Sequence, residues 1–255
     1  MPHELSIFGK EIPLYGIFFF LGIIIAGTVS IIPMKKRKIP CMDWVSAAAF
    51  AMIGAIIGSK LLFIIVSFKQ IIELNLSIYA VIKGGFVFYG GLIGGIIGIL
   101  IYTKKYKLPT IDYFDVAAVV VPLGHAFGRV GCFFGGCCYG MPYSGKFAVV
   151  YTQTEGMTPL NQPLFPIQLL EAILLLLTFF CLFIVFIKKP NKRGMPTFLY
   201  TVVYSLMRFS LEFLRGDKER GIIGFLSTSQ IISISILIAS ITIFIFIKKK
   251  RAALI

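Results

Sequence analysis

The chain has 255 residues, of which 58% are hydrophobic and 14% are charged. A soluble domain is usually under half apolar and about a quarter charged, so this composition excludes an ordinary soluble globule, a disordered chain and a disulfide-dense secreted module. The formal net charge is +14, and the basic residues cluster between apolar runs. That pattern is typical of membrane orientation signals, so we expect a membrane protein and no nucleic-acid partner.

Seven apolar runs follow one another along the chain, each close to the length of about 20 residues that a helix needs to cross a bilayer. The runs are continuous rather than alternating, which favours helices over strands. We predict membrane-spanning helices at residues 12–32, 44–67, 85–102, 114–133, 166–187, 195–214 and 225–247. The predicted fold is thus an all-α integral membrane protein of about seven spans, a single membrane domain over residues 1–255.

Lysine and arginine clusters follow every second run, so one side of the membrane collects them, at residues 35–38, 104–107, 188–193 and 248–251. The positive-inside rule then places the N-terminus outside and the C-terminus in the cytoplasm. The longest outer connection is the loop region 134–165. The first residues lack the basic segment and the small-residue cleavage site of a signal peptide, so we expect the first span to be retained.

Glycines at helical spacing predict close helix packing in the second and third runs. Gly54 and Gly58 are four apart in the second run, and residues 90–98 of the third run hold overlapping small-xxx-small patterns. Glycine lets helix backbones approach closely, and such packing is the main cohesive term in lipid. We interpret most of these glycines as packing residues.

Ionisable residues inside an apolar run cost about 2.5 to 3.5 kcal/mol each on insertion scales and usually mark function. In the predicted orientation these residues fall in the outer half or at the outer end of their spans, with Tyr15 and Tyr89 beginning two spans on the same side. We therefore predict that the helices bring polar groups to one depth, open toward the outer leaflet. The ionisable residues are Lys60, Arg129, Glu171, Arg208 and Glu212, with Arg215 at a span end and His125 slightly deeper.

Arg208 and Glu212 are four residues apart and share a helix face. If Glu212 holds Arg208 or Arg215, another guanidinium remains for an anion, and its planar fork suits a phosphate. Two or three arginines in an outward-opening cavity therefore indicate a phosphorylated head group. Structural ion pairs between helices are the alternative, and Lys60 and Arg215 can also extend along their span ends to reach water.

The motif GRVGCFFGGCCYG, residues 128–140, ends the fourth run and holds Cys132, Cys137 and Cys138. Its glycines permit unusual backbone angles and the close approach of a ligand. Small buried thiols, a disulfide on an oxidising outer face and a thiol-redox site are all open interpretations. A metal site with His125 needs more ligands in the right geometry, and we predict no metal and no other cofactor.

Five segments together resemble the prolipoprotein diacylglyceryl transferase family, bacterial membrane enzymes with seven spans. They are PLYGIFFFLG, GGFVFYGGLIGGIIG, GRVGCFFGG, FPIQLLEA and MRFSLEFLRGD, and the similarity covers roughly Leu14 to Ile247. The chain departs from the family signature at four positions: Tyr89 stands where the family has His, Cys132 and Gly135 where it has Asn, and Cys137 where it has Glu. The retained family positions are Tyr15, Arg129, Gly131, Glu171, Arg208, Glu212 and Arg215.

The resemblance implies transfer of the diacylglyceryl group from phosphatidylglycerol to the lipobox cysteine thiol of a prolipoprotein, with release of glycerol phosphate, in the bacterial plasma (inner) membrane. It implies phosphatidylglycerol, the lipobox peptide and the membrane as partners. The alternative is a non-catalytic or altered-substrate paralogue that binds or transports lipid. The expected catalytic residues are Arg129, Arg208 and Tyr89, and the expected substrate-binding residues are Tyr15, Lys60, Gly131, Glu171, Glu212 and Arg215.

Overall fold

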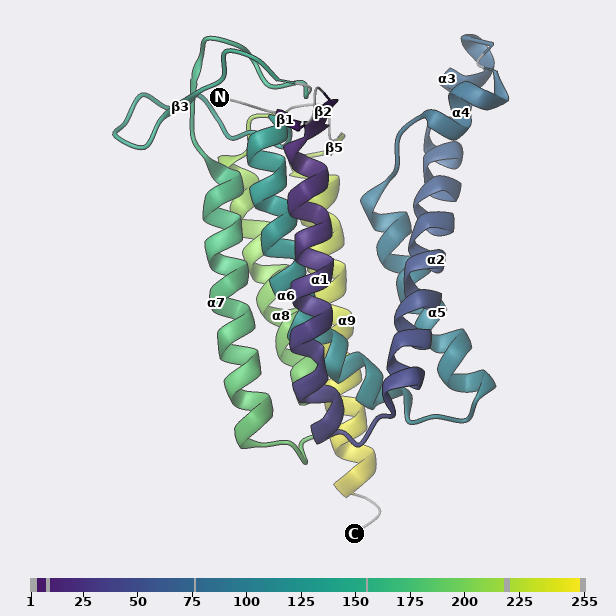
Figure 1. Ribbon diagram of the computed structural model, residues 1–255. Helices are drawn as coiled ribbons and strands as arrows, with labels where there is room; N and C mark the ends of the chain where they lie inside the picture. The colour runs from purple at the N-terminus through teal and green to yellow at the C-terminus, as the bar shows by residue number, and fades with distance from the viewer. Residues whose placement is uncertain (1–3, 8–9, 76, 155, 218–220, 253–255) are drawn as a thin grey trace. The chain divides into compact units, whose positions relative to one another are not determined.

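The computed structural model describes residues 4–7, 10–75, 77–154, 156–217 and 221–252, and these are mostly helical (Figure 1). Each of the seven apolar runs forms a helix whose bounds lie within about five residues of those predicted. The seven helices are α1 (Leu14–Lys36), α2 (Cys41–Val66), α5 (Phe88–Lys105), α6 (Thr110–Gly135), α7 (Ile167–Lys188), α8 (Met195–Leu211) and α9 (Thr228–Ala252).

Five of the helices in the described ranges are long and apolar enough to cross a membrane: α1, α2, α6, α7 and the part of α9 from Thr228 to Ile247. Helix α5 has only 18 residues and ends on Lys104 and Lys105. Helix α8 has 17 residues, about 26 Å at 1.5 Å per residue, and continues as the single 3-10 turn η1 (Glu212–Leu214). The chain is therefore a multi-pass membrane protein by composition, and the number of seven spans stays a prediction.

Short elements join the long helices, and the all-α prediction missed the strands among them. Three antiparallel hairpins pair β1 (Glu4–Ile7) with β2 (Lys10–Pro13), β3 (Val149–Val150) with β4 (Pro163–Leu164), and β5 (Ile222–Ile223) with β6 (Leu226–Ser227). Two short helices, α3 (Phe68–Glu73) and α4 (Ile78–Lys83), follow α2. Strands of two to four residues are too short to show an alternating pattern, which explains why they were missed.

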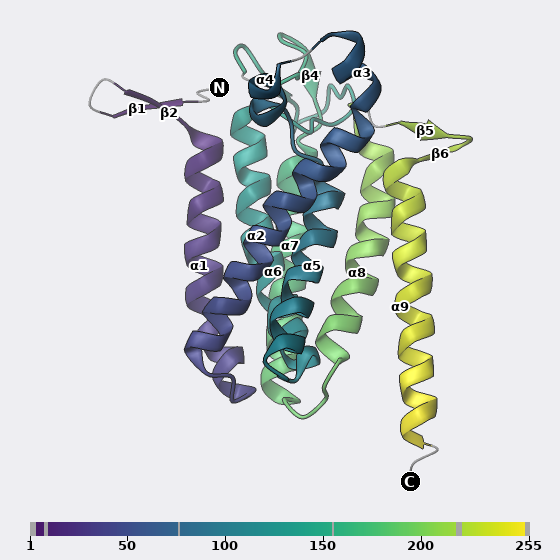
Figure 2. The same ribbon diagram turned by 90° about the vertical axis from the view of Figure 1, so that its right-hand side faces the viewer.

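The chain divides into two compact units, and the prediction of a single membrane domain stays untested. The smaller unit, Met34–Phe114, is built on α2 and α5, which lie side by side in Figures 1 and 2. A Cβ added to Gly94 would lie 2.0 Å from the carbonyl oxygen of Gly54, and one added to Gly58 would lie 2.3 Å from that of Gly90. The predicted role of these glycines in close helix packing is thus confirmed, and the structure shows that α2 and α5 are each other's partners.

The larger unit, Met1–Pro33 with Asp115–Ile255, contains α1, most of α6, and α7, α8 and α9. Helix α8 packs against both α7 and α9. The carboxylate of Asp115 on α6 accepts hydrogen bonds from the backbone N–H of Gly194 (2.8 Å) and of Thr197 (3.2 Å) and from the Thr197 hydroxyl (2.7 Å). Because these bonds tie the beginning of α8 to α6, the polar residues farther along both helices come to the same region.

Candidate active site

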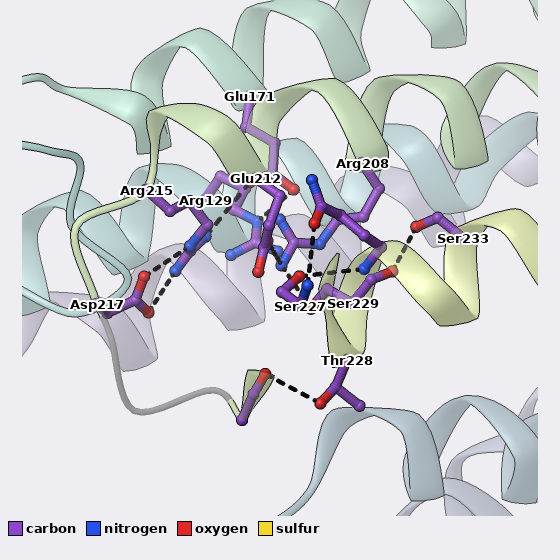
Figure 3. A network of polar contacts seen from close by, with 12 residues as sticks. Arg129, Glu171, Arg208, Glu212, Arg215, Asp217, Ser227, Thr228, Ser229 and Ser233 are labelled. Carbon is purple, nitrogen blue, oxygen red and sulfur yellow. Dashed lines mark hydrogen bonds and ion pairs between the residues drawn. The ribbon is translucent and has the colours of Figure 1, made fainter. Parts of the chain in front are cut away.

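Three arginines of the larger unit meet carboxylates near the ends of α6, α7 and α8 (Figure 3). Nε of Arg129 on α6 lies 3.0 Å from Oε1 of Glu171 on α7, and Nη1 of Arg215 lies 4.0 Å from Oε2 of the same residue. Nη2 of Arg208 lies 2.7 Å from Oε2 of Glu212, one helical turn later. Of the two partners that the sequence leaves open for Glu212, the structure shows Arg208, and Glu171 links two arginines that are distant in the sequence.

This arginine cluster is shielded from water. Glu171 is fully buried, Arg208 is 5% exposed, and the side chain of Arg129 is 12% exposed. A buried ion without a partner costs several kcal/mol, so such groups persist only where each positive charge has a negative one beside it. The cluster meets that condition with three cations and three anions: Arg129, Arg208, Arg215, Glu171, Glu212 and Asp217.

Two members of the cluster were not identified from the sequence. Asp217 accepts two hydrogen bonds of 2.8 Å, from Nε and Nη2 of Arg215, and Ser229 on α9 accepts one of 3.1 Å from Nη2 of Arg208. Burial works against the charged form of Arg215, but its interactions with Asp217 and Cys138 together outweigh burial and raise the pKa of Arg215 above its ordinary value. The sequence signal for Asp217 was its place two residues after an arginine at a span end; a serine such as Ser229 gives none.

The cluster retains unused hydrogen-bond donors. Within the part of the chain that the structure describes, the buried Nη1 atoms of Arg208 and Arg215 donate no hydrogen bond. A buried N–H without an acceptor costs about 1 to 3 kcal/mol. Guanidinium donors held rigidly by carboxylates are suited to an anionic oxygen, because charge-assisted hydrogen bonds are the stronger ones and a prepared donor needs no reorganisation. The arrangement can therefore bind a phosphate and stabilise charge that develops on it.

Tyr15 and Gly131 meet where α1 passes α6. A Cβ added to Gly131 would lie 3.1 Å from the carbonyl oxygen of Tyr15 and 3.3 Å from Cβ of Phe18, so the glycine lets the two helices approach closely. The Tyr15 ring stacks on Phe19 with 6.2 Å between centroids, and the residue remains 43% exposed. Gly131 thus has a packing role, and substrate binding by either residue stays a prediction.

Lys60 and Tyr89 belong to the smaller unit. Nζ of Lys60 donates to the carbonyl oxygens of Val81 (3.1 Å), Gly84 (2.8 Å) and Gly85 (3.2 Å), which closes the end of α4. An ammonium group has three donors, so these bonds give Lys60 a structural role. Tyr89 is partly buried on α5. The participation of Lys60 and Tyr89 in the same site as the arginine cluster stays a prediction.

The glycine-rich motif brings its three cysteines together. The Sγ atoms of Cys132, Cys137 and Cys138 all lie within 4.8 Å of one another, and the structure pairs none of them in a disulfide. Cys132 follows Arg129 by three residues, so the sulfur cluster adjoins the arginine cluster on α6. The disulfide that the sequence left open is therefore not formed in the structure.

A multi-pass helical membrane protein with a buried arginine–carboxylate cluster is the class that this fold and site define. A family model described as prolipoprotein diacylglyceryl transferase matches residues 2–246. A protein of Clostridium tetani (strain Massachusetts / E88), named phosphatidylglycerol–prolipoprotein diacylglyceryl transferase, is 38% identical over 244 residues, covering 95% of this chain and 96% of that relative.

Two further relatives agree. One from Clostridium perfringens (strain 13 / Type A), with the same name numbered 2, is 34% identical over 94% of this chain and 92% of its own length. One from Clostridium botulinum (strain Langeland / NCTC 10281 / Type F), again with that name, is 31% identical over 93% of each chain. The chain belongs to the prolipoprotein diacylglyceryl transferase family, and the resemblance inferred from its motifs is confirmed.

Proposed function

We propose that this chain is a transferase that moves the diacylglyceryl group of phosphatidylglycerol to the lipobox cysteine thiol of a prolipoprotein and releases glycerol phosphate. Membership of the family and the names of the relatives support this proposal. The observation that carries it in the chain itself is the buried cluster in which Glu171 and Glu212 hold Arg129 and Arg208, with unused guanidinium donors beside them.

The reaction is a displacement at carbon by sulfur. The thiol releases its proton to solvent, the thiolate forms a C–S bond to the glyceryl carbon, and the C–O bond to the phosphate breaks, so that glycerol phosphate leaves with the electron pair as a dianion. Negative charge grows on the leaving phosphate in the transition state. Arg129 and Arg208 stabilise that charge, since they are fixed before the reaction begins.

The expected site residues of the larger unit act around this pair of arginines. Glu171 and Glu212 orient the guanidinium groups, and Arg215 adds a third positive charge. Tyr15 and Gly131 contact the head group from the α1–α6 crossing. Tyr89, where the family has histidine, donates a hydrogen bond, and Lys60 contributes positive charge near the lipid.

A transfer assay tests the function. Purified protein receives labelled phosphatidylglycerol and a synthetic lipobox peptide, and mass spectrometry detects the thioether product. Arg129→Ala and Arg208→Ala should each lower turnover by about 100-fold or more, as removal of a donor to a developing oxyanion does. Arg193→Ala, an exposed arginine after α7, is the matched control and should keep full activity. Full turnover in both site variants would remove the assigned roles, and an inactive wild-type protein would refute the function.

A second candidate is a lipid-binding or lipid-transporting paralogue without transferase chemistry. The departures from the family signature at Tyr89, Cys132, Gly135 and Cys137 favour it. Complementation of a strain that lacks the transferase separates the two candidates. Growth with the wild-type chain supports the transferase, whereas growth only with Tyr89→His and Cys132→Asn supports the paralogue.

The membrane arrangement completes the proposal. The chain spans the bacterial plasma (inner) membrane seven times, with the N-terminus and the connection 134–165 outside and the C-terminus in the cytoplasm. The alternating basic clusters support this orientation. The arginine cluster then lies toward the outer leaflet, where a secreted prolipoprotein reaches it.

A further inference from the structure

The three cysteines after α6 form a compact sulfur cluster, Cys132, Cys137 and Cys138, that the transferase chemistry does not use. Their Sγ atoms lie within 4.8 Å of one another, and all three residues are partly exposed. In a tetrahedral thiolate site with metal–sulfur bonds of about 2.3 Å, sulfur atoms lie about 3.8 Å apart. The Sγ separations are therefore at most about 1 Å longer than those in a metal–thiolate site.

Hydrogen bonds from buried residues hold the backbone of the sulfur cluster in place. The side-chain amide of Gln168, itself 1% exposed, donates to the carbonyl oxygen of Cys137 (2.9 Å). The Cys137 N–H donates to the carbonyl oxygen of Cys132 (3.1 Å). The Thr158 hydroxyl, 4% exposed, donates to the carbonyl oxygen of Gly136. These bonds fix the turn that returns Cys137 and Cys138 to the end of α6.

Two backbone conformations in this turn are unfavourable for most residues. Gly136 has φ = +62°, and Cys138 has φ = +58°, which a cysteine rarely adopts. A left-handed conformation at a residue other than glycine costs of order 1 kcal/mol and persists only where its surroundings hold it. Tyr151 adds to that support, since burial raises its pKa to about 12 and its protonated hydroxyl donates to the carbonyl oxygen of Phe133 (2.9 Å).

Two arginines lie beside the sulfur cluster. Arg129 lies one turn before Cys132, and a backbone bridge between Gly140 and Arg215 brings Arg215 to the same loop. Both guanidinium charges act on Cys138. Three thiolates around a divalent ion carry one net negative charge, which neighbouring cations stabilise. Soft thiolate donors select thiophilic metal ions over Mg²⁺ or Ca²⁺.

We propose that Cys132, Cys137 and Cys138 form a trithiolate site for a thiophilic metal ion of the Zn²⁺ and Cd²⁺ class, with water as the fourth ligand. Each thiol releases its proton to solvent as its sulfur binds the ion. The site links the end of α6 to the loop that pairs with Arg215, and so it stabilises the position of Arg215 in the arginine cluster. The proposal is independent of the proposed function, because it requires no transferase turnover.

Titration with Cd²⁺ tests the metal site in the full-length protein, purified with a phosphine reductant. The readout is the ultraviolet sulfur-to-cadmium charge-transfer absorption. We expect one Cd²⁺ per chain, an intensity that corresponds to three thiolates, and competition by Zn²⁺. Cys132→Ser, Cys137→Ser and Cys138→Ser should each weaken binding by about 100-fold or more, because even the loss of a residue that only supports a ligand costs about 10–100-fold. Cys41→Ser and Cys181→Ser are matched controls, lie outside the cluster and should change nothing.

Folding of the variants is controlled with Cys132→Asn/Cys137→Glu, which places the residues of the family signature at both positions. This variant should elute and unfold as a normal protein yet lose the cadmium absorption. Absence of the absorption in the reduced wild-type protein would overturn the proposal. An equal loss in Cys41→Ser or Cys181→Ser would also overturn it, as would a disulfide between two of the three cysteines in protein alkylated directly in cells.

Discussion

Glu171 forms ion pairs with two members of the arginine cluster, because one carboxylate oxygen faces Arg129 and the other faces Arg215. Glu171→Gln keeps the side-chain volume but removes the charge. Loss of one partner from a buried pair costs about 3–5 kcal/mol. We therefore expect the thermal unfolding midpoint in detergent to fall by many degrees. Glu73→Gln is the control, since Glu73 pairs with Lys69 at 3.7 Å on an exposed helix face.

The control pair should contribute no more than about 0.5 kcal/mol, because water screens both of its charges. Equal midpoints for Glu171→Gln and the wild-type protein would contradict a structural role of the buried carboxylate. Equal shifts in the two variants would do the same.

Arg208 differs from a simple point charge. Its Nη2 atom contacts both Glu212 and Ser229, while its Nη1 atom is the unused donor. A lysine has one nitrogen and cannot hold Glu212 and serve a phosphate in the same geometry. Arg208→Lys should therefore lower kcat of the transfer reaction by about 100-fold. Circular dichroism and gel filtration check that the variant folds; a wild-type kcat would show that a positive charge alone is sufficient.

At the residue scale, the sequence predicts which residues belong to the arginine cluster better than it predicts which of them form ion pairs. Charges inside apolar runs are rare, so Arg129, Glu171 and Arg208 stand out by their positions in the chain alone. The Arg208–Glu212 pair follows from helical spacing. The link from Arg129 to Glu171 does not, because it depends on how α6 and α7 pack. Asp217 lies in a loop, and its place two residues after Arg215 is a weak signal that does not separate a buried partner from a solvated carboxylate.

Helix α5 allows a matched test of glycine packing within the smaller unit. A Cβ on Gly94 would lie 2.0 Å from the backbone oxygen of Gly54, whereas a Cβ on Gly95 would lie 3.5 Å from the nearest atom, an oxygen of Ala51. Gly94→Ala must therefore push α2 and α5 apart, at a cost of about 1–3 kcal/mol for overpacking. Gly95→Ala should be neutral or slightly stabilising, because alanine is the better helix former. Thermal unfolding of the two variants checks this, and equal midpoints would contradict it.

At the element scale, long apolar runs predict the seven main helices because helix formation in an apolar chain depends on length and hydrophobicity, both visible in sequence. The short elements depend on partners instead. β3 and β4 exist because Val149 and Leu164 pair across a loop, and α4 is completed by the bonds of Lys60 to carbonyl oxygens near its end. Such contacts join residues that are distant in the sequence, so no local pattern indicates them.

At the scale of the whole molecule, the sequence predicts the class of protein and its family but not its division into two units. Within the smaller unit, glycines of α2 and α5 meet. In the sequence, the motif around Gly94 is compatible with several partner helices. The structure identifies the partner as α2, which contains Gly54. Among the described residues, five helices satisfy length and composition for a span, while α5 and α8 are short for a bilayer of about 30 Å. The number of crossings therefore has to be measured.

Labelling of two exposed loop positions tests the number of membrane crossings. Ser144 lies between α6 and α7, and Asn191 lies between α7 and α8 beside the basic residues 188–193. Seven crossings with basic loops inside place these positions on opposite sides of the membrane, because moving lysine and arginine across the bilayer is unfavourable. In intact spheroplasts, a membrane-impermeant maleimide should label Ser144→Cys but label Asn191→Cys only after permeabilisation, as resolved by peptide mass mapping. The wild-type chain gives the background from its own cysteines.

The pattern of labelling distinguishes the arrangements physically. If α7 did not cross the membrane, both positions would lie on the same side and would be labelled under the same conditions. Glu171 would then lie on a helix at the membrane surface, where lipid does not bury its charge. If the whole orientation were reversed, Asn191→Cys alone would label, and the arginine cluster would open toward the cytoplasm. A thiol acceptor on a secreted prolipoprotein could not then reach Arg129 and Arg208, so either result would contradict the proposed reaction as well as the topology.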